Sequence, residues 1–202
     1  MSWQPTATLA ALQARATLNQ RLRAFFAARG VLEVETPLLC QHSGTDPNLQ
    51  PITTAQTRYL QTSPEFAMKR LLAAGSGAIY QLGKAFRDGE RGERHNPEFT
   101  MLEWYRPGFS LEQLMDEVEA LVRAVLQDNT IGNMQRLSYR ALFKQHLGID
   151  PHTMALADLQ RLTATKVSVD PALLQSRSTC LDLLYGHVIE PALVAPLFVY
   201  HY

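Results

Sequence analysis

The chain has 202 residues, of which 46% are hydrophobic and 19% are charged. This composition is typical of a folded globular protein and excludes a largely disordered chain. Lys and Arg together number 19, as do Asp and Glu, so the formal net charge is zero. A neutral chain argues against a broad polyanion-binding surface but still allows a local basic site.

The cysteines and the N-terminal residues indicate a cytoplasmic protein. Cys40 and Cys180 are too few for a disulfide framework and lack the spacing of metal ligands, so we expect reduced thiols. The chain does not open with a basic segment followed by an apolar run, so we expect no signal peptide. No apolar run approaches the roughly 18 residues of a membrane span, and we expect no membrane partner.

The first quarter of the chain changes from a helical to an extended pattern. Residues 9–29 place Leu and Phe on one stripe, which predicts a long amphipathic helix that Gly30 would end. Residues 31–37 alternate apolar and acidic side chains, which predicts a strand that ends at Pro37. Residues 41–57 are polar and contain a glycine and two prolines, so we expect a loop.

A second helix is predicted to begin at the sequence Ser63-Pro64-Glu65. Ser63 is a favourable N-cap, and Pro64 suits the first helical position. Glu65 would lie in the first turn, where the helix dipole favours an anion. We expect a short strand over residues 58–62 before this helix, and we expect the helix to run to about Ala74.

Residues 78–86 and 97–106 predict an antiparallel hairpin with a charged loop at its tip, over residues 88–94. Side chains of a strand alternate between two faces, so one face of the returning strand should carry an aromatic ring, a thioether, a carboxylate and a phenol. Such a face could bind a base and an ammonium group, although the same residue types are common in ordinary sheets. The four residues are Phe99, Met101, Glu103 and Tyr105.

The second half of the chain has fewer motifs. The sequence Ser110-Leu111-Glu112-Gln113 is a capping box that opens the clearest amphipathic helix. After Asn129 the pattern weakens, and we expect short helices near residues 138–147, 156–163 and 178–185, followed by a strand over residues 197–200.

Three charged side chains near the hairpin suggest a chemistry. Arg87 ends the outgoing strand, where a guanidinium can bind a phosphate through two hydrogen bonds. Glu65 and Glu103 are two separated carboxylates, and a lysine-like ligand has two amines that match them.

The residue identities in two segments are more specific than the periodic pattern. Residues 86–90 and 95–103, Phe-Arg-Asp-Gly-Glu and His-Asn-Pro-Glu-Phe-Thr-Met-Leu-Glu, resemble motif 2 of class II lysyl-tRNA synthetases. Residues 29–37 resemble their motif 1. Both occur in the family's order and at its separation, and the resemblance covers about residues 15–127.

The resemblance implies an α+β fold, a class II aminoacyl-tRNA synthetase-like antiparallel sheet flanked by helices. Residues 1–202 would form part of a catalytic domain, truncated at its C-terminal end before motif 3. The implied parts are motif 1 over about 15–37, motif 2 over about 78–106 and a helical insertion over about 129–196.

Within that superfamily the chain is most similar to the ligases that attach (R)-β-lysine to elongation factor P. Residues 62–65, 102–107 and 198–202 resemble the corresponding segments of these ligases. The residues before the motif 1 helix are too few for an anticodon-binding domain. The resemblance implies that ATP, with Mg²⁺, activates (R)-β-lysine or lysine as an adenylate. The adenylate is then transferred to a lysine side chain of elongation factor P, by an enzyme that is a homodimer.

The resemblance also implies roles for single residues. Arg87 would be catalytic, because it neutralises charge on the α-phosphate during attack. Pro37 would lie by the dimer interface. The ATP-binding residues would be Arg87, Asp88, Gly89, Asn96 and Phe99, with a supporting role for His95. The residues that bind the amino acid would be Ser63, Pro64, Glu65, Glu103 and Tyr105.

Two departures from the family pattern matter. Gly89 stands where synthetases usually have Glu, so a contact to the base would be lost or moved to Glu90. Motif 3 and the acidic residues that hold Mg²⁺ do not occur in the sequence, so we expect no metal ligands within this chain. We therefore expect residues 1–202 alone to catalyse adenylation weakly or not at all.

Two alternatives stay open at this point. The chain could be the catalytic core of a lysyl-tRNA synthetase that charges tRNA, although the lack of an anticodon-binding domain disfavours tRNA. It could also be a non-catalytic binding paralogue, which the loss of motif 3 favours. The sequence does not distinguish α-lysine from β-lysine, because the two isomers carry one amine on adjacent carbon atoms.

Overall fold

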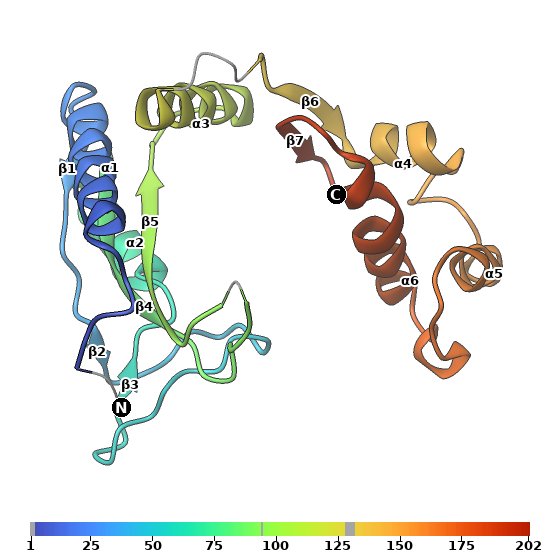
Figure 1. Cartoon of the computed structure of the whole chain (residues 1–202), viewed down its shortest axis with the longest axis horizontal. Helices are drawn as coiled ribbons and strands as arrows, with labels where there is room; N and C mark the ends of the chain where they lie inside the picture. The colour runs from blue at the N-terminus through green and yellow to red at the C-terminus, as the bar shows by residue number, and fades with distance from the viewer. Residues whose placement is uncertain (1–2, 94, 128–131) are drawn as a thin grey trace. The chain divides into compact units, whose positions relative to one another are not determined.

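The computed structural model describes residues 3–93, 95–127 and 132–202 (Figure 1). The chain divides into two compact units, Met1–Gln127 and Asp128–Tyr202, each with its own hydrophobic core. Helices and strands both contribute to each unit, which confirms the α+β class. Arg94 of the predicted loop and the expected start of the insertion at residue 129 lie outside the described residues.

The N-terminal unit is built on a three-stranded sheet of order β1–β4–β5. Strands β4 (Ile79–Phe86) and β5 (Glu98–Tyr105) form the predicted antiparallel hairpin, paired along their full length from Ile79 with Tyr105 to Phe86 with Glu98. Strand β1 (Leu32–Glu33) pairs with β4 in parallel, so the sheet is mixed rather than wholly antiparallel. A separate antiparallel pair joins β2 (Leu39–Cys40) to β3 (Tyr59–Leu60).

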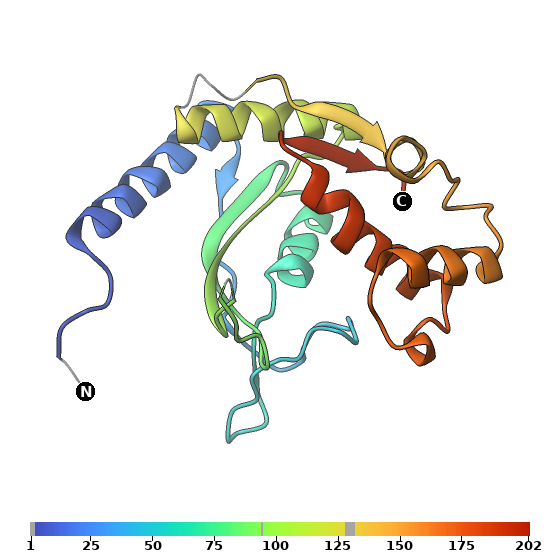
Figure 2. The same ribbon diagram turned by 45° about the vertical axis from the view of Figure 1, so that its right-hand side comes forward.

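Two helices cover one face of the hairpin. Residues of α1 (Leu9–Ala27) and α3 (Leu111–Leu126) form one core cluster with side chains of β4 and β5. The third helix, α2 (Glu65–Ala73), lies on the other side of the sheet from α1 in Figure 2. The side chains of β4 and β5 that face the core cluster are Tyr80, Leu82, Leu102 and Trp104.

Phe26 is the centre of this core. Its side chain is fully buried, its ring stacks on Tyr80 with centroids 4.4 Å apart, and it lies 5.6 Å from the ring of Trp104. Aromatic packing of this kind adds about 0.5–1.5 kcal/mol per pair to the stabilisation from buried area. The aromatic cluster therefore fixes α1 against the covered face of the hairpin.

The buried side-chain amides of Gln81 and Gln61 hold the backbone that follows β1 and the strand β4. Gln81 Oε1 accepts a hydrogen bond from the backbone N of Thr36 at 2.9 Å, and Gln61 Nε2 donates to the carbonyl of Lys84 at 2.8 Å. These bonds explain why the strand predicted over residues 31–37 is only two residues long. The N–H of Thr36 binds a side chain instead of a neighbouring strand, and Pro37 has no N–H to donate.

The C-terminal unit combines a parallel strand pair with short helices. Strand β6 (Gln135–Ser138) pairs with β7 (Leu197–Tyr200), and Ser138 Oγ caps the next helix by accepting from Ala141 N. We predicted helices in this region and β7, but not β6 or the turns that follow α6. The remaining elements are α4 (Tyr139–Leu147), α5 (Leu156–Lys166), α6 (Arg177–Leu184), the 3₁₀ turns Pro171–Leu173 and Glu190–Ala192, and a π turn over Tyr185–Ile189.

Other predicted boundaries differ by small amounts. Helix α1 ends at Ala27, and α2 begins at Glu65, so that Pro64 is its capping residue rather than its first helical residue. Both cysteines are unpaired. Among the described residues, no helix has the length and apolar character that a membrane span requires.

We expect the substitution Phe26→Ala to lower the free energy of unfolding of the N-terminal unit by about 3–5 kcal/mol, because it opens a cavity between α1 and the hairpin. Urea unfolding measures the change. Gln13→Ala is a matched control on the same helix, because Gln13 is exposed and its replacement should cost about 0.5 kcal/mol or less. Equal losses for the two variants would contradict this account of the core.

Candidate active site

The second face of the hairpin carries Phe99, Met101, Glu103 and Tyr105. Because directly opposite residues of an antiparallel pair share a face, Phe99 lies beside Ala85 and Met101 beside Gly83. Both neighbours are small, and Ala85 is fully buried. A side chain at position 83 would be crowded, because its Cβ would meet the amide of Gln81 at 3.2 Å. Glu103 and Tyr105 continue the same face toward the end of β5.

Ser63, Glu103 and Tyr105 form a hydrogen-bonded chain across this face. Ser63 Oγ donates to Glu103 Oε2 at 2.8 Å, and the Tyr105 hydroxyl donates to Glu103 Oε1 at 2.6 Å. Both oxygens of the carboxylate are therefore held in place. Burial raises the pKa of the Tyr105 phenol, and its hydrogen bond and proximity to Glu103 raise that pKa further. The phenol is thus a neutral donor at physiological pH.

Glu65 lies near the same cluster, because its charge also raises the pKa of Tyr105. Its backbone N donates to Ser63 Oγ at 3.0 Å, and its carboxylate forms an ion pair with Lys69 one helical turn later. Both partners of this pair are about half exposed, and such pairs contribute little. The carboxylate of Glu65 can therefore exchange Lys69 for the ammonium group of a ligand. Pro64 is buried between Ser63 and Glu65.

Arg87 lies at the far end of the hairpin. Its backbone N donates to the carbonyl of Pro97 at 2.8 Å, and its Nε donates to the carbonyl of Thr62 at 3.3 Å. Its guanidinium is 5.1 Å from the centre of the Phe99 ring, within the range of a cation–π contact. These contacts fix a positive charge beside the open aromatic ring.

A cavity of about 220 Å³ lies next to Arg87. Glu90 faces it and is 3.6 Å from Arg87 Nη1, whereas Asp88 and Gly89 lie in the exposed loop between those two residues. Gly89 has a φ of 75°, a left-handed conformation that favours glycine in the turn. The residues that line the cavity are Arg87, Glu90, His95, Asn96 and Phe99.

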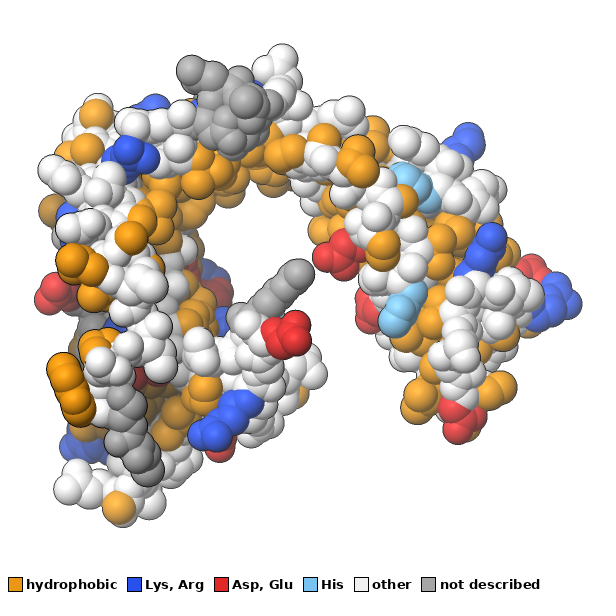
Figure 3. Space-filling view, in the orientation of Figure 1, with side chains coloured by type: hydrophobic (Ala, Val, Ile, Leu, Met, Phe, Trp, Pro, Cys, Tyr) orange, Lys and Arg blue, Asp and Glu red, His pale blue; other side chains and the backbone are white. Residues whose placement is uncertain are grey.

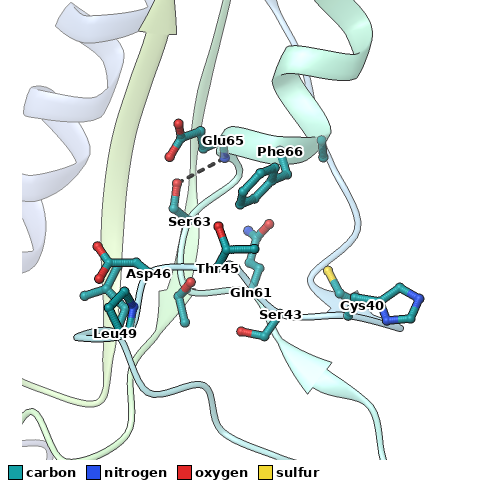
Figure 4. A pocket seen from close by; sticks show the side chains of 14 residues that line it. Cys40, Ser43, Thr45, Asp46, Leu49, Gln61, Ser63, Glu65 and Phe66 are labelled. Atoms are coloured by element: carbon teal, nitrogen blue, oxygen red, sulfur yellow. Dashed lines mark hydrogen bonds between the residues drawn. The ribbon is translucent and has the colours of Figure 1, made fainter.

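A second cavity, of about 460 Å³, adjoins Ser63 and Glu65 and was not predicted (Figure 4). The loop over residues 40–49 forms one wall. Asp46 and Leu49 lie at the end of the cavity opposite Cys40 in Figure 4, and Phe66 faces it from α2. The only sequence signal was the density of hydroxyl and carboxyl groups in this loop, which is also typical of solvent-exposed turns.

The charged side chains form two groups. Glu65 and Glu103 lie around Ser63, whereas Arg87 lies beside Phe99 with Glu90 3.6 Å from its Nη1. The described residues include no group of three or more His, Cys, Asp or Glu side chains that could hold a metal ion. The arrangement can therefore bind a molecule with ammonium groups at one end and a phosphate at the other.

Comparisons with known proteins identify the family of the chain. The profile of the family described as tRNA synthetases class II (D, K and N) matches residues 2–202. A protein of Yersinia enterocolitica named elongation factor P–(R)-beta-lysine ligase is 47% identical over 213 residues, which cover 100% of this chain and 65% of the relative. A protein of the same name from Pseudoalteromonas translucida is 47% identical over 212 residues, which cover 99% of this chain and 64% of the relative. The chain thus spans slightly less than two thirds of the length of these relatives.

We expect Ser63→Ala to lower the free energy of unfolding by about 1–2 kcal/mol, because the hydroxyl is both the acceptor for Glu65 N and a donor to a part-buried carboxylate. Urea unfolding measures the loss. Ser76→Ala is the control, because the Ser76 hydroxyl only donates to the adjacent Gly77 carbonyl at 3.3 Å. A loss for Ser63→Ala no larger than the control would contradict the proposed bonding.

Proposed function

Because the chain belongs to the class II tRNA synthetases (D, K and N), we propose that it supplies the ATP and amino-acid sites of a ligase that activates a lysine-type amino acid. One observation carries the proposal. Arg87 lies beside the ring of Phe99 at one end of the open hairpin face, and the Ser63–Glu103–Tyr105 chain lies at the other. A phosphate and an ammonium can thus be held on one surface.

The first step is the formation of an adenylate. A carboxylate oxygen of the amino acid attacks the α-phosphorus of ATP, the bond to the β-phosphate oxygen breaks, and pyrophosphate leaves. Arg87 neutralises the negative charge that builds on the α-phosphate, which is electrostatic stabilisation by a preorganised group. Phe99 stacks on the adenine, and Asn96, Asp88 and Gly89 contact ATP. Glu90, which lines the same cavity, replaces the base contact that Gly89 cannot make.

The amino acid is held by its two amines. Glu103 and Tyr105 bind the distal ammonium, because the carboxylate is fixed by two hydrogen bonds and needs no reorganisation to receive a charge. Glu65 binds the amine nearer the reacting carboxylate, with Ser63 and Pro64 setting the position of the helix start. Mg²⁺ would accompany ATP and screen its phosphates; we assign it no ligand among the described residues.

The second step is the attack of an amine on the adenylate, which releases AMP and forms an amide. The names of the relatives favour (R)-β-lysine as the amino acid and a lysine of elongation factor P as the acceptor. This acceptor would be met in the cytoplasm. Charging of tRNA is the second candidate, since the family name itself refers to tRNA synthetases.

We also propose a homodimer. Leu9, Leu12 and Leu18 of α1 have exposed fractions of 70%, 50% and 37%, and hydrophobic side chains appear along the α1 edge in Figure 3. Leu38 and Leu39, next to Pro37, are exposed as well. A second copy would cover these side chains, which are otherwise unfavourable in water.

We expect Arg87→Ala to reduce amino-acid-dependent ATP–pyrophosphate exchange about 10²–10³-fold, because the charge on the α-phosphate is left without its neutralising group. The assay uses the protein expressed from its complete gene. Arg91→Ala removes an exposed arginine of the same loop and should leave the rate within about twofold. A similar rate for Arg87→Ala and Arg91→Ala would reject the catalytic role.

The acceptor is tested by competition. The same protein is incubated with Mg-ATP, labelled α-lysine or (R)-β-lysine, elongation factor P and tRNA, and the labelled macromolecule is identified. We expect the label on elongation factor P and a preference for (R)-β-lysine. Label on tRNA would contradict the ligase and indicate a lysyl-tRNA synthetase. ATP–pyrophosphate exchange without label on either macromolecule would support the activation step and contradict both acceptors. Binding of an aminoacyl-adenylate analogue without exchange would indicate a non-catalytic paralogue.

A further inference from the structure

Glu117 is a charged residue inside the core of the N-terminal unit. It lies on α3, on the side that faces the covered face of the hairpin, and its side chain is only 5% exposed. A buried carboxylate is costly unless partners compensate for its lost hydration. Its partners therefore indicate why the residue is there.

The partners of Glu117 come from the end of β5. Trp104 Nε1 donates to Glu117 Oε2 at 3.1 Å, and Arg106 Nε lies 3.4 Å from Glu117 Oε1. Arg106 is itself 14% exposed, so this ion pair is poorly screened by water. Arg29, which follows α1, adds a weaker contact at 4.0 Å.

Trp104 and Arg106 are the two neighbours of Tyr105 in the chain. Since side chains alternate along a strand, Glu117 holds residues 104 and 106 on the covered face while Tyr105 and Glu103 project from the open face. The pair Ile79–Tyr105 is the last one in the ladder. Strand pairing therefore holds Tyr105 from one side only, and the contacts of Trp104 and Arg106 with Glu117 add a second constraint on this strand end.

We propose that Glu117 is a positioning residue for the amino-acid site: through Trp104 and Arg106 it fixes the strand end that carries Tyr105 and Glu103. The inference deepens the proposed function and rests on it for its kinetic consequence. Tyr105 and Phe99 are six residues apart on β5, or about 20 Å, so loss of the anchor should disturb recognition of the distal ammonium and spare the ATP end.

Two variants test this role in the protein expressed from its complete gene. Glu117→Gln keeps an oxygen that can accept from Trp104 but removes the charge that faces Arg106. Trp104→Phe keeps an aromatic ring and removes the N–H donor together with part of the indole, so it tests the anchor even if Glu117→Gln folds poorly. Leu121→Ala is the matched control, because Leu121 is a buried core residue of the same helix and a cavity there destabilises the unit without touching the anchor.

The first readout is ATP–pyrophosphate exchange. We expect both anchor variants to raise the KM for the amino acid about tenfold, since a displacement near 1 Å can cost this much or more, with the KM for ATP within about twofold. The control should lower the amount of active protein and leave both KM values unchanged. An unchanged amino-acid KM in the anchor variants, or an equal rise in the KM for ATP, would overturn the proposal.

The second readout does not require activity. The ring-carbon resonances of Tyr105 in ¹³C-tyrosine-labelled protein, assigned with Tyr105→Phe, report the surroundings of the phenol at neutral pH. We expect these chemical shifts to change in Glu117→Gln, because the phenol moves away from Glu103, and to keep their values in Leu121→Ala. Unchanged chemical shifts in Glu117→Gln would overturn the positioning role. If the wild type shows no exchange with any lysine-type amino acid, the proposed function fails, and these chemical shifts still decide whether Glu117 positions Tyr105.

Discussion

The packing of Phe26 against Tyr80 and Trp104 determines which side chains of the hairpin face α1 and α3 and which face the candidate site. Once α1 and α3 cover the aromatic face, the period-two alternation of β4 and β5 forces every other side chain onto the opposite face. Glu103 and Tyr105, whose polar groups a ligand could use, lie on that opposite face. The buried core and the candidate active site are therefore two sides of the same pair of strands, and a shift of register by one residue would exchange them.

The same constraint explains the division of charge. The carboxylate of Glu103 accepts a hydrogen bond at each oxygen, and these two bonds orient it without a positively charged partner among the described residues. Arg87 is held by backbone carbonyls and an aromatic ring, and its ion pair with Glu90 is long, at 3.6 Å. Neither charge is neutralised by a tight partner within the site. Both remain available for groups of the opposite sign on a ligand.

Local rules predicted the hairpin and the capped helices, because each depends on residues close in sequence. The shared face of Phe99 and Glu103 follows from alternation alone, and the capping box at Ser110 is present as predicted. Contacts between distant segments could not be predicted this way. The bond from Ser63 to Glu103 spans 40 residues, and the cavity beside Asp46 depends on where a polar loop closes. The role of Glu117 was hidden for the same reason, since a single carboxylate in an amphipathic helix is usually solvent-exposed.

The two units, each with its own core, can be followed by different spectroscopic signals. Both tryptophans, Trp3 and Trp104, belong to the unit Met1–Gln127, whereas helices occur in both units. Tryptophan emission therefore reports the melting of the first unit only, and far-ultraviolet circular dichroism reports a sum over both. Cooperative melting of the two units would make the two midpoints coincide, and separate midpoints would show that the units unfold in distinct steps.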